Sequence, residues 1–214
     1  MSRLLFLLCV LLAGCVASKH KQESTAIVTS PTKSISQSTF PDEKDWEHYF
    51  KLIKKYTDLA GIYELRKTTL PVSDFEVRVW YSGSFEPMEC VIIRKKDDAW
   101  EAVHLKGNKE SKPTQVTKTK LSQPSVGWEV FWERLGQQDI LQLPGSVGMP
   151  LNDGSGYLVE VRAKGIYKPS VFLNPQFFAQ KGAKEILEIS NILAREFHLP
   201  HFDRTASIEK EIRH

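Results

Sequence analysis

The stretch Phe75-Glu76-Val77-Arg78-Val79-Trp80-Tyr81 decides the fold class of this 214-residue chain. Its apolar residues recur at every second position, which is the side-chain period of a β-strand. Glu76 and Arg78 therefore lie on the face opposite to these apolar residues. The later stretch Tyr157-Leu158-Val159-Glu160-Val161-Arg162-Ala163 alternates in the same way and places Glu160 and Arg162 together. The sequence thus predicts two half-buried strands, each with a charged pair on one face.

Further strands are predicted beside these two. Residues 90–93 and 100–105 form two runs joined by the charged turn Lys95-Lys96-Asp97-Asp98, with the spacing of an antiparallel meander. Lys164-Gly165 separates the second alternating strand from residues 166–173, so this pair is predicted to be a hairpin. Residues 107–115 contain Asn, Ser and Pro and are predicted to be a surface loop.

Three segments have the apolar spacing of an amphipathic helix. The first starts at the N-cap candidate Asp42 and ends before Gly61. The second follows Ser125 and closes at Leu143-Pro144-Gly145, and the third begins after Gly182 and ends by residue 200. Upstream of the third helix, residues 174–175 (Asn-Pro) are a helix-start signature.

These elements predict an α+β fold, with a single domain in which a mostly antiparallel sheet carries helices packed on one face. The other face, with Glu76, Arg78, Glu160 and Arg162, is expected to be open to water. These four residues are the candidate binding face, because alternating charges on a sheet can recognise a peptide. A solvated face with cross-strand ion pairs explains the same pattern.

The first sixteen residues predict where the protein is held. Arg3 precedes a short apolar run, residues 4–12, and small residues follow it, which is typical of a secretory signal peptide. The run is too short for a transmembrane helix, which needs about 20 apolar residues. It ends in Leu12-Ala13-Gly14-Cys15, which resembles the lipobox of bacterial lipoprotein precursors. A signal peptide with a chance cysteine, or a short membrane anchor, is the alternative.

The lipobox resemblance implies a membrane partner. In that family the chain is cleaved before the cysteine, here Cys15, whose thiol is diacylated, and the new amino terminus is usually acylated as well. Val16 stands where an Asp would be the usual retention signal for the inner membrane. The resemblance therefore implies the outer membrane, facing the periplasm, in a diderm source, and the outer leaflet of the plasma membrane in a monoderm one.

The chain is predicted to have four parts. Residues 1–14 are the signal peptide, and residues 15–40 are the lipidated cysteine and a tether rich in Ser, Thr and Lys. The tether has too few apolar residues to offset its ordering entropy, so it is expected to be disordered. Residues 41–204 form the α+β globular domain, and residues 205–214 are a C-terminal tail.

The C-terminal half of the domain resembles a group of small uncharacterised bacterial envelope proteins. The resemblance covers about 75 residues and rests on generic elements, and it implies no known activity. These elements are Phe131-Trp132, Leu135, Asp153-Gly154, Tyr157, Glu160, Gly165, Tyr167, Asn174-Pro175 and the closing helix.

Charge and cysteine content narrow the function classes. The formal net charge is +3 at pH 7 and falls by one when Arg3 leaves, which is too mild to indicate nucleic-acid binding. Of the three cysteines, Cys9 leaves with the signal and Cys15 takes lipid, so Cys90 has no partner for an intramolecular disulfide. Its apolar flanks predict a buried strand residue instead of a nucleophile.

No catalytic or cofactor motif stands out. His198, His201 and Asp203 are zinc-type ligands, but Pro200 interrupts any helix that would align the two histidines, so a polar loop is favoured over a metal site. The chain has no glycine-rich phosphate-binding run, and no cofactor is expected. The helical aromatic pairs Trp46/Phe50 and Trp128/Trp132 could line a sugar or peptide groove, although residues at this spacing are more often core.

The leading interpretation is a non-enzymatic cell-envelope lipoprotein, whose tethered domain binds or scaffolds an envelope protein or cell-wall component. An envelope hydrolase is the first alternative, and it would need His198 or His201 close to a carboxylate such as Asp153 or Glu160. An inhibitor of a secreted enzyme is the second, and it would form a tight stoichiometric complex.

Overall fold

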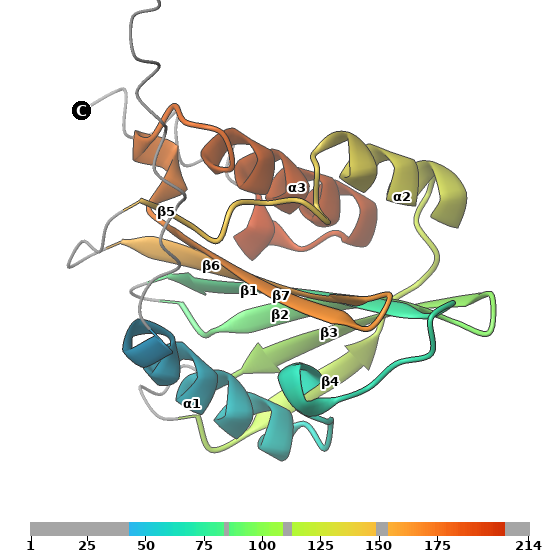
Figure 1. The fold of residues 1–214 in the computed structure, drawn as a ribbon, viewed down its shortest axis with the longest axis horizontal. Coiled ribbons are helices and arrows are strands. Elements are labelled where there is room, and N and C mark those ends of the chain that lie inside the picture. The colour runs from blue at the N-terminus through green and yellow to red at the C-terminus, as the bar shows by residue number, and fades with distance from the viewer. Residues whose placement is uncertain (1–42, 84–85, 109–112, 149–153, 204–214) are drawn as a thin grey trace, which may run out of the picture. The chain divides into compact units, whose positions relative to one another are not determined.

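The domain is built on one sheet. The computed structural model describes residues 43–83, 86–108, 113–148 and 154–203. Seven strands follow the order β4-β3-β2-β1-β6-β7-β5 (Figure 1), and every neighbouring pair is antiparallel except β5 and β7. The predicted α+β fold with a single, mostly antiparallel sheet is therefore confirmed.

The elements alternate between helices and groups of strands. The helices are α1 (Glu43–Leu59), α2 (Trp128–Gln137) and α3 (Ala183–Phe197), with short 3-10 turns η1 (Leu65–Lys67), η2 (Pro175–Phe177) and η3 (Pro200–Phe202). The strands are β1 (Phe75–Gly83), β2 (Glu89–Lys96), β3 (Ala99–Gly107), β4 (Val116–Lys120), β5 (Ser146–Gly148), β6 (Ser155–Ala163) and β7 (Ile166–Leu173). None of the described helices is long and apolar enough to cross a membrane. The predicted signal peptide and tether lie outside the described residues.

The central strand β1 joins the two halves of the sheet. It pairs with β2 on one side and with β6 on the other, which brings the two alternating stretches side by side. Glu76 lies opposite Arg162, and Arg78 lies opposite Glu160. The register therefore gathers the four predicted charged residues at one place on one face of the sheet.

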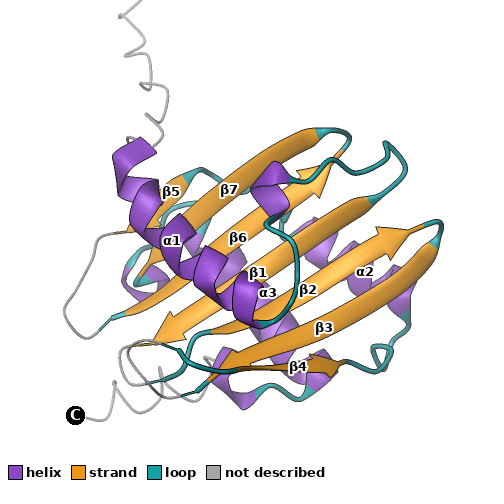
Figure 2. Ribbon diagram, turned by 90° about the horizontal axis from the view of Figure 1, so that it is seen from below, coloured by secondary structure: helices purple, strands orange, loops and turns teal. Residues whose placement is uncertain are grey.

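That face is not open to water, so this expectation is wrong. Helices α2 and α3 cover one face as predicted, but α1 crosses the other (Figures 1 and 2). Ile53 and Tyr56 of α1 pack there in a second buried apolar cluster, which includes Trp80, Cys90 and Ile92 of β1 and β2. The inner strands thus bury apolar side chains on both faces, and α1 has an apolar surface to cover.

The larger core lies between the sheet and α3. Ile186, Ile189 and Leu193 of α3 are fully buried against strand residues such as Val79 and Phe172. Complete burial of a side chain of this size contributes about 1.5–3 kcal/mol. This cluster and the one beneath α1 hold the sheet from both sides.

At the local level, one prediction is wrong, two strands were missed and one prediction is confirmed. Helix α2 ends at Gln137 and not near residue 142, since Asp139 adopts a left-handed φ of 53°. The edge strands β4 and β5 were not predicted, because β4 is mostly exposed and β5 has only three residues. Cys90 is buried in β2 as predicted, and burial raises the pKa of its thiol well above the ordinary value.

Two glycines provide a matched test of the β5–β7 junction. Gly148 has a φ of 96°, and a Cβ there would collide with the carbonyl oxygen of Leu173. Gly148→Ala should therefore lower the free energy of unfolding by about 2 kcal/mol or more. Gly136→Ala in α2, where a Cβ meets nothing within 4 Å, should raise it by about 0.5–1 kcal/mol. Urea denaturation measures both, and equal changes in the two variants would contradict the described junction.

Candidate functional site

A connection that we call the strap, residues 60–74, joins α1 to β1 and returns over the same face of the sheet as α1 (Figure 2). It contains η1, whose Leu65 is completely buried and anchors the segment by its side chain. The rest of the strap is polar or only partly buried. The strap therefore needs further contacts to stay in place.

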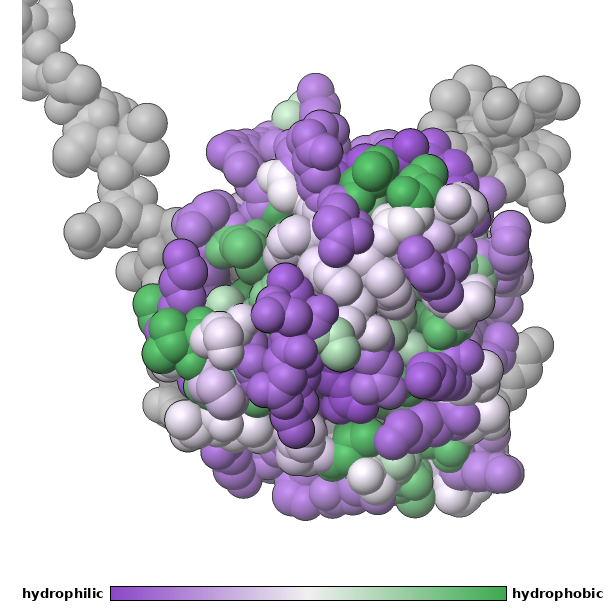
Figure 3. All heavy atoms as spheres, turned by 90° about the vertical axis from the view of Figure 1, so that its right-hand side faces the viewer, coloured by the Kyte–Doolittle hydropathy of each residue, from purple (hydrophilic) through white to green (hydrophobic). Residues whose placement is uncertain are grey.

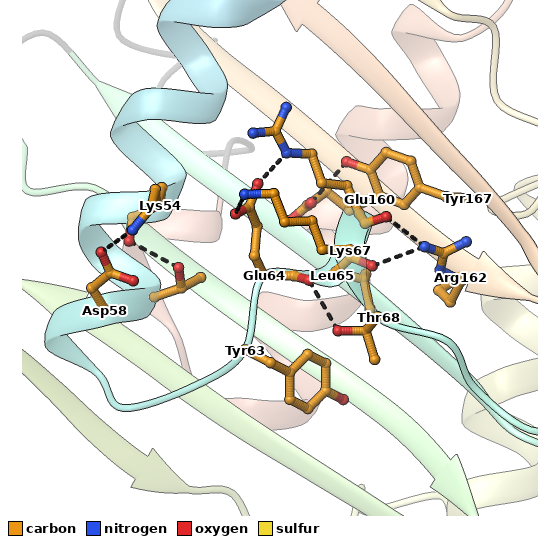
Figure 4. Close-up of polar contacts among 12 residues, drawn as sticks. Lys54, Asp58, Tyr63, Glu64, Leu65, Lys67, Thr68, Glu160, Arg162 and Tyr167 are labelled. Atoms are coloured by element: carbon orange, nitrogen blue, oxygen red, sulfur yellow. Dashed lines mark hydrogen bonds and ion pairs between the residues drawn. The ribbon is translucent and has the colours of Figure 1, made fainter.

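These contacts are hydrogen bonds from sheet arginines to strap carbonyls. Arg78 Nη1 donates to the carbonyl of Tyr63 at 2.9 Å. Arg162 Nη2 donates to the carbonyl of Arg66 at 2.6 Å (Figure 4). The hydroxyl of Tyr63 also donates to the carboxylate of Glu76. Charged donors make stronger hydrogen bonds than neutral ones, so β1 and β6 fix the path of the strap.

The strap covers charges that are fully withdrawn from water. Glu76, Arg78 and Glu160 are 1%, 0% and 1% exposed. Arg78 Nε lies 2.7 Å from Glu76 Oε1 in a buried ion pair. Glu160 accepts hydrogen bonds from Trp80 Nε1 at 2.7 Å and from the Tyr167 hydroxyl at 2.9 Å. Every charge in this group therefore has a partner.

The ionisation of the group follows from burial and from this pairing. Burial alone would lower the pKa of Arg78, but the carboxylates of Glu76 and Glu160 raise it above the ordinary value, so Arg78 keeps its charge. Burial raises the pKa of Glu160, while Arg78 and the donors Trp80 and Tyr167 oppose that change. The cluster works as internal structure, because its side chains keep almost no exposed surface.

The four residues of the candidate binding face are thus brought together, but three of them are buried. Arg162 is half-buried and is occupied by the strap carbonyls. Glu76 also lines a hollow. Direct binding by this set would require the strap to leave.

The hollow itself lies at the end of the strap. It is a groove of about 830 Å³ between the strap, the β2–β3 turn and the start of β3. Its walls include Thr69, Pro71, Trp100 and Lys120. Figure 3 faces the end of the sheet where the β2–β3 turn lies and shows neutral surface near its middle, interrupted by hydrophilic groups.

Trp100 is the largest aromatic wall of the groove, and α2 holds it from behind. Its ring stacks on Trp128 with centroids 5.6 Å apart and meets Phe75 edge-on at 5.3 Å. Among the described residues, the buried Trp100 Nε1 has no hydrogen-bond acceptor. The expectation that Trp128 and Trp132 pack against the core is confirmed, since both are partly buried against it. The side chain of Trp46 lies outside the described part of the chain.

Some of the charged side chains around the groove form ion pairs, and others do not. Arg94 pairs with Glu101 through two nitrogens at 2.8 and 2.7 Å, and Lys95 lies 3.1 Å from Asp98. Lys96 and Lys120 also line the groove, and neither forms an ion pair within the described ranges. Asp74 and Asp97 line the groove as well, and neither carboxylate forms an ion pair within those ranges, so two ammonium groups and two carboxylates are left without an opposite charge.

A second polar cluster lies on the α3 side of the sheet, around Glu89. His104 Nε2 is 2.9 Å from Glu89 Oε2, and Lys106 Nζ is 2.8 Å from Glu89 Oε1. Burial alone would raise the pKa of Glu89, but the hydrogen bond with His104 and the Lys106 charge lower it. His201 Nδ1 lies 3.7 Å from Glu89 and 3.8 Å from Glu86, beyond hydrogen-bond distance.

The carboxylates near His201 are not the ones considered from the sequence, Asp153 and Glu160. His201 lies beside Glu86 and Glu89, while Asp153 is outside the described residues. Within the part of the chain that is described, no group of three or more His, Cys, Asp or Glu side chains could hold a metal ion.

The groove was not predicted, because its walls come from irregular or short segments. Leu70-Pro71 belongs to a stretch without the apolar periodicity of a helix or strand. Trp100 lies at the start of a predicted strand, where a tryptophan is expected to be a core residue. The useful signal is the lysine pair 95–96 immediately before an exposed turn and a tryptophan. Its meaning depends on the strap, whose path the sequence does not indicate.

Removal of the buried cation tests the charge cluster. Arg78→Met leaves Glu76 buried without its ion-pair partner, so the free energy of unfolding should fall by about 3–5 kcal/mol. Arg195→Met breaks the exposed Arg195–Glu188 pair and should change it by about 0–1 kcal/mol. Urea denaturation compares the two variants. A loss below 1 kcal/mol in Arg78→Met would show that the ion pair is not buried in solution.

The Glu89 cluster predicts a pH dependence of stability. Because the folded-state pKa of Glu89 is lowered, its contribution is complete above the unfolded pKa of about 4.5 and is lost as the pH falls through the folded value. Glu89→Gln should therefore cost about 1.5–3 kcal/mol at pH 7 and much less at acid pH. The exposed Glu133→Gln serves as the control. A pH-independent cost in Glu89→Gln, measured by urea denaturation between pH 3 and 7, would contradict the assignment.

Comparison with known proteins adds no relative. No protein-family model matches the chain, and no curated protein matches it significantly. The function is therefore inferred from the residues and their geometry.

Proposed function

We propose that this protein is a lipid-anchored protein of the bacterial cell envelope, whose domain binds another envelope component. The anchoring part of the proposal rests on Leu12-Ala13-Gly14-Cys15, with lipid on Cys15. These residues and the tether lie outside the described part of the structure. As a coil, residues 16–40 would span about 25–30 Å and allow the domain to reach a partner away from the bilayer.

The observation that carries the binding role is the groove beside the strap. Its volume of about 830 Å³ lies within the range of ligand sites, roughly 300–1,000 Å³. It combines an aromatic wall, Trp100, with the cations Lys96 and Lys120. Such a combination of apolar contact and a few polar groups is typical of binding sites.

The location of the groove also favours a binding role over a purely structural one. Both faces of the sheet are covered by helices, so a ligand must use an edge or an end of the sheet. The groove opens at the end where the β2–β3 turn lies, and its strap wall is fixed by Arg78 and Arg162. A preformed site loses less conformational entropy on binding than a flexible one.

Lipidation is tested by replacement of the cysteine. In bacteria that express the full chain, Cys15→Ala should abolish the added lipid mass and move the protein from the membrane to the soluble fraction. Cys9→Ala lies in the apolar run and should leave both properties unchanged. Intact-mass analysis and membrane fractionation measure the outcome. An unlipidated wild-type chain in the soluble fraction would refute the anchor.

A further inference from the structure

The lining of the groove is balanced in charge. Four of its side chains are cationic and four are carboxylates: Arg94, Lys95, Lys96, Lys120, Asp74, Glu76, Asp97 and Glu101. An ion of either sign would therefore meet as many like charges as opposite ones. A neutral ligand avoids this repulsion, and its polar groups can use cationic donors and carboxylate acceptors together.

Asp74 is the wall residue that most favours a ligand. It lines the groove, although only 4% of the residue is exposed. Its Oδ1 accepts hydrogen bonds from the Ser73 hydroxyl at 3.0 Å and from the Asp97 main-chain N–H at 3.4 Å. Its Oδ2 accepts none from the described residues. A carboxylate withdrawn from most of the solvent gains from each further donor, so Asp74 suits a ligand group that donates a hydrogen bond.

Tyr63 provides an aromatic surface of fixed orientation in the same groove. It is 39% exposed and lines the groove from the strap. Its hydroxyl donates to Glu76, and the Arg78 guanidinium carbon lies 5.0 Å from the centre of its ring. Because Arg78 covers one face of the ring, a ligand can meet only the other face or the edges. A ring held in this way binds an apolar surface with little loss of side-chain freedom.

A sugar combines the properties that these walls require. Each of its hydroxyls can both donate and accept hydrogen bonds, so it suits carboxylates and ammonium groups alike. The C–H groups of a sugar ring form an apolar face, which can pack on an aromatic ring. A neutral sugar therefore suits Asp74, the unpaired lysines and Tyr63 at the same time, and it brings no net charge into the groove.

We propose that the groove binds a neutral oligosaccharide. One hydroxyl of the ligand donates to Asp74 Oδ2, and a sugar ring packs on Tyr63. Hydroxyls elsewhere on the ligand accept hydrogen bonds from the lysine ammonium groups that line the groove. This assignment rests on the proposed binding role of the groove and specifies its ligand class.

The test uses the mature lipoprotein in a detergent without a sugar headgroup, and isothermal titration calorimetry measures binding. The probes are two neutral tetrasaccharides: cellotetraose, a plain glucan, and chitotetraose, which carries N-acetylhexosamines as cell-wall glycans do. At least one of them should bind saturably, and the preferred one indicates the source of the ligand. Tetragalacturonate, the charged control, should bind about tenfold more weakly or not at all, because it brings carboxylates beside those of the groove.

Two variants of groove residues test the contacts. Asp74→Asn replaces an acceptor oxygen by a donor, and Tyr63→Ala removes the ring, so each should weaken binding about tenfold or more while urea unfolding stays cooperative. Tyr63→Phe keeps the ring and should bind within about threefold of the wild type. Phe177→Ala should change binding less than about twofold, because Phe177 is 58% exposed and does not line the groove.

Undiminished binding in Asp74→Asn and Tyr63→Ala, or equal binding of tetragalacturonate, would overturn the assignment. The peptide Glu-Leu-Glu-Leu-Glu and phosphatidylglycerol vesicles are the competing probes. If one of them binds with the Tyr63 dependence and neither tetrasaccharide does, the groove is a binding site but not a sugar site. If no probe binds, the binding role of the groove falls as well.

Discussion

The structure depends on one buried cation. Arg78 stands in the middle of the central strand with no exposed surface, and its neighbours Glu76 and Glu160 are equally buried. Charges in this position are costly unless each finds a partner, and an arginine has five donors to satisfy. Glu76 takes one of them, and the main chain of the strap takes another through the carbonyl of Tyr63. The charges on the sheet therefore require the strap, and the strap in turn closes over them.

This requirement explains how an irregular segment can serve as a rigid wall. The strap lacks regular strand pairing, yet Arg78 and Arg162 hold its carbonyls and Leu65 fills the space beneath. Lifting the strap would expose the ion pair and break charge-assisted hydrogen bonds together. The next residues, Thr69 and Leu70, make no hydrogen bond to any other residue of the described ranges. The contacts that fix the strap and the groups available to a ligand therefore lie only a few residues apart.

The period-two pattern was sufficient to predict the sheet, its mostly antiparallel character and the placement of both charged pairs on one face. It did not predict that β1 and β6 are neighbours. It could not predict that the charged face is buried, because an alternation of Glu and Arg looks the same whether water or a strap covers it. Trp80, between Arg78 and Tyr81, was the overlooked signal. A large aromatic residue on the same face as two charges indicates that something covers that face. The groove was missed for a different reason, since its shape depends on the tertiary path of a segment without periodicity.

Because helices cover both faces of the sheet, only part of the domain surface can bind a ligand through the strands. Helix α1 covers one face, and α2 and α3 cover the other, so the edges and the ends of the sheet remain for binding. The edge strand β4 is short and bears Lys118 and Lys120, and lysines on an edge discourage pairing with another sheet. At the end of that strand, however, Lys120 lines the groove. The strand that discourages pairing with another sheet along its length thus contributes a wall of the recess at its terminus.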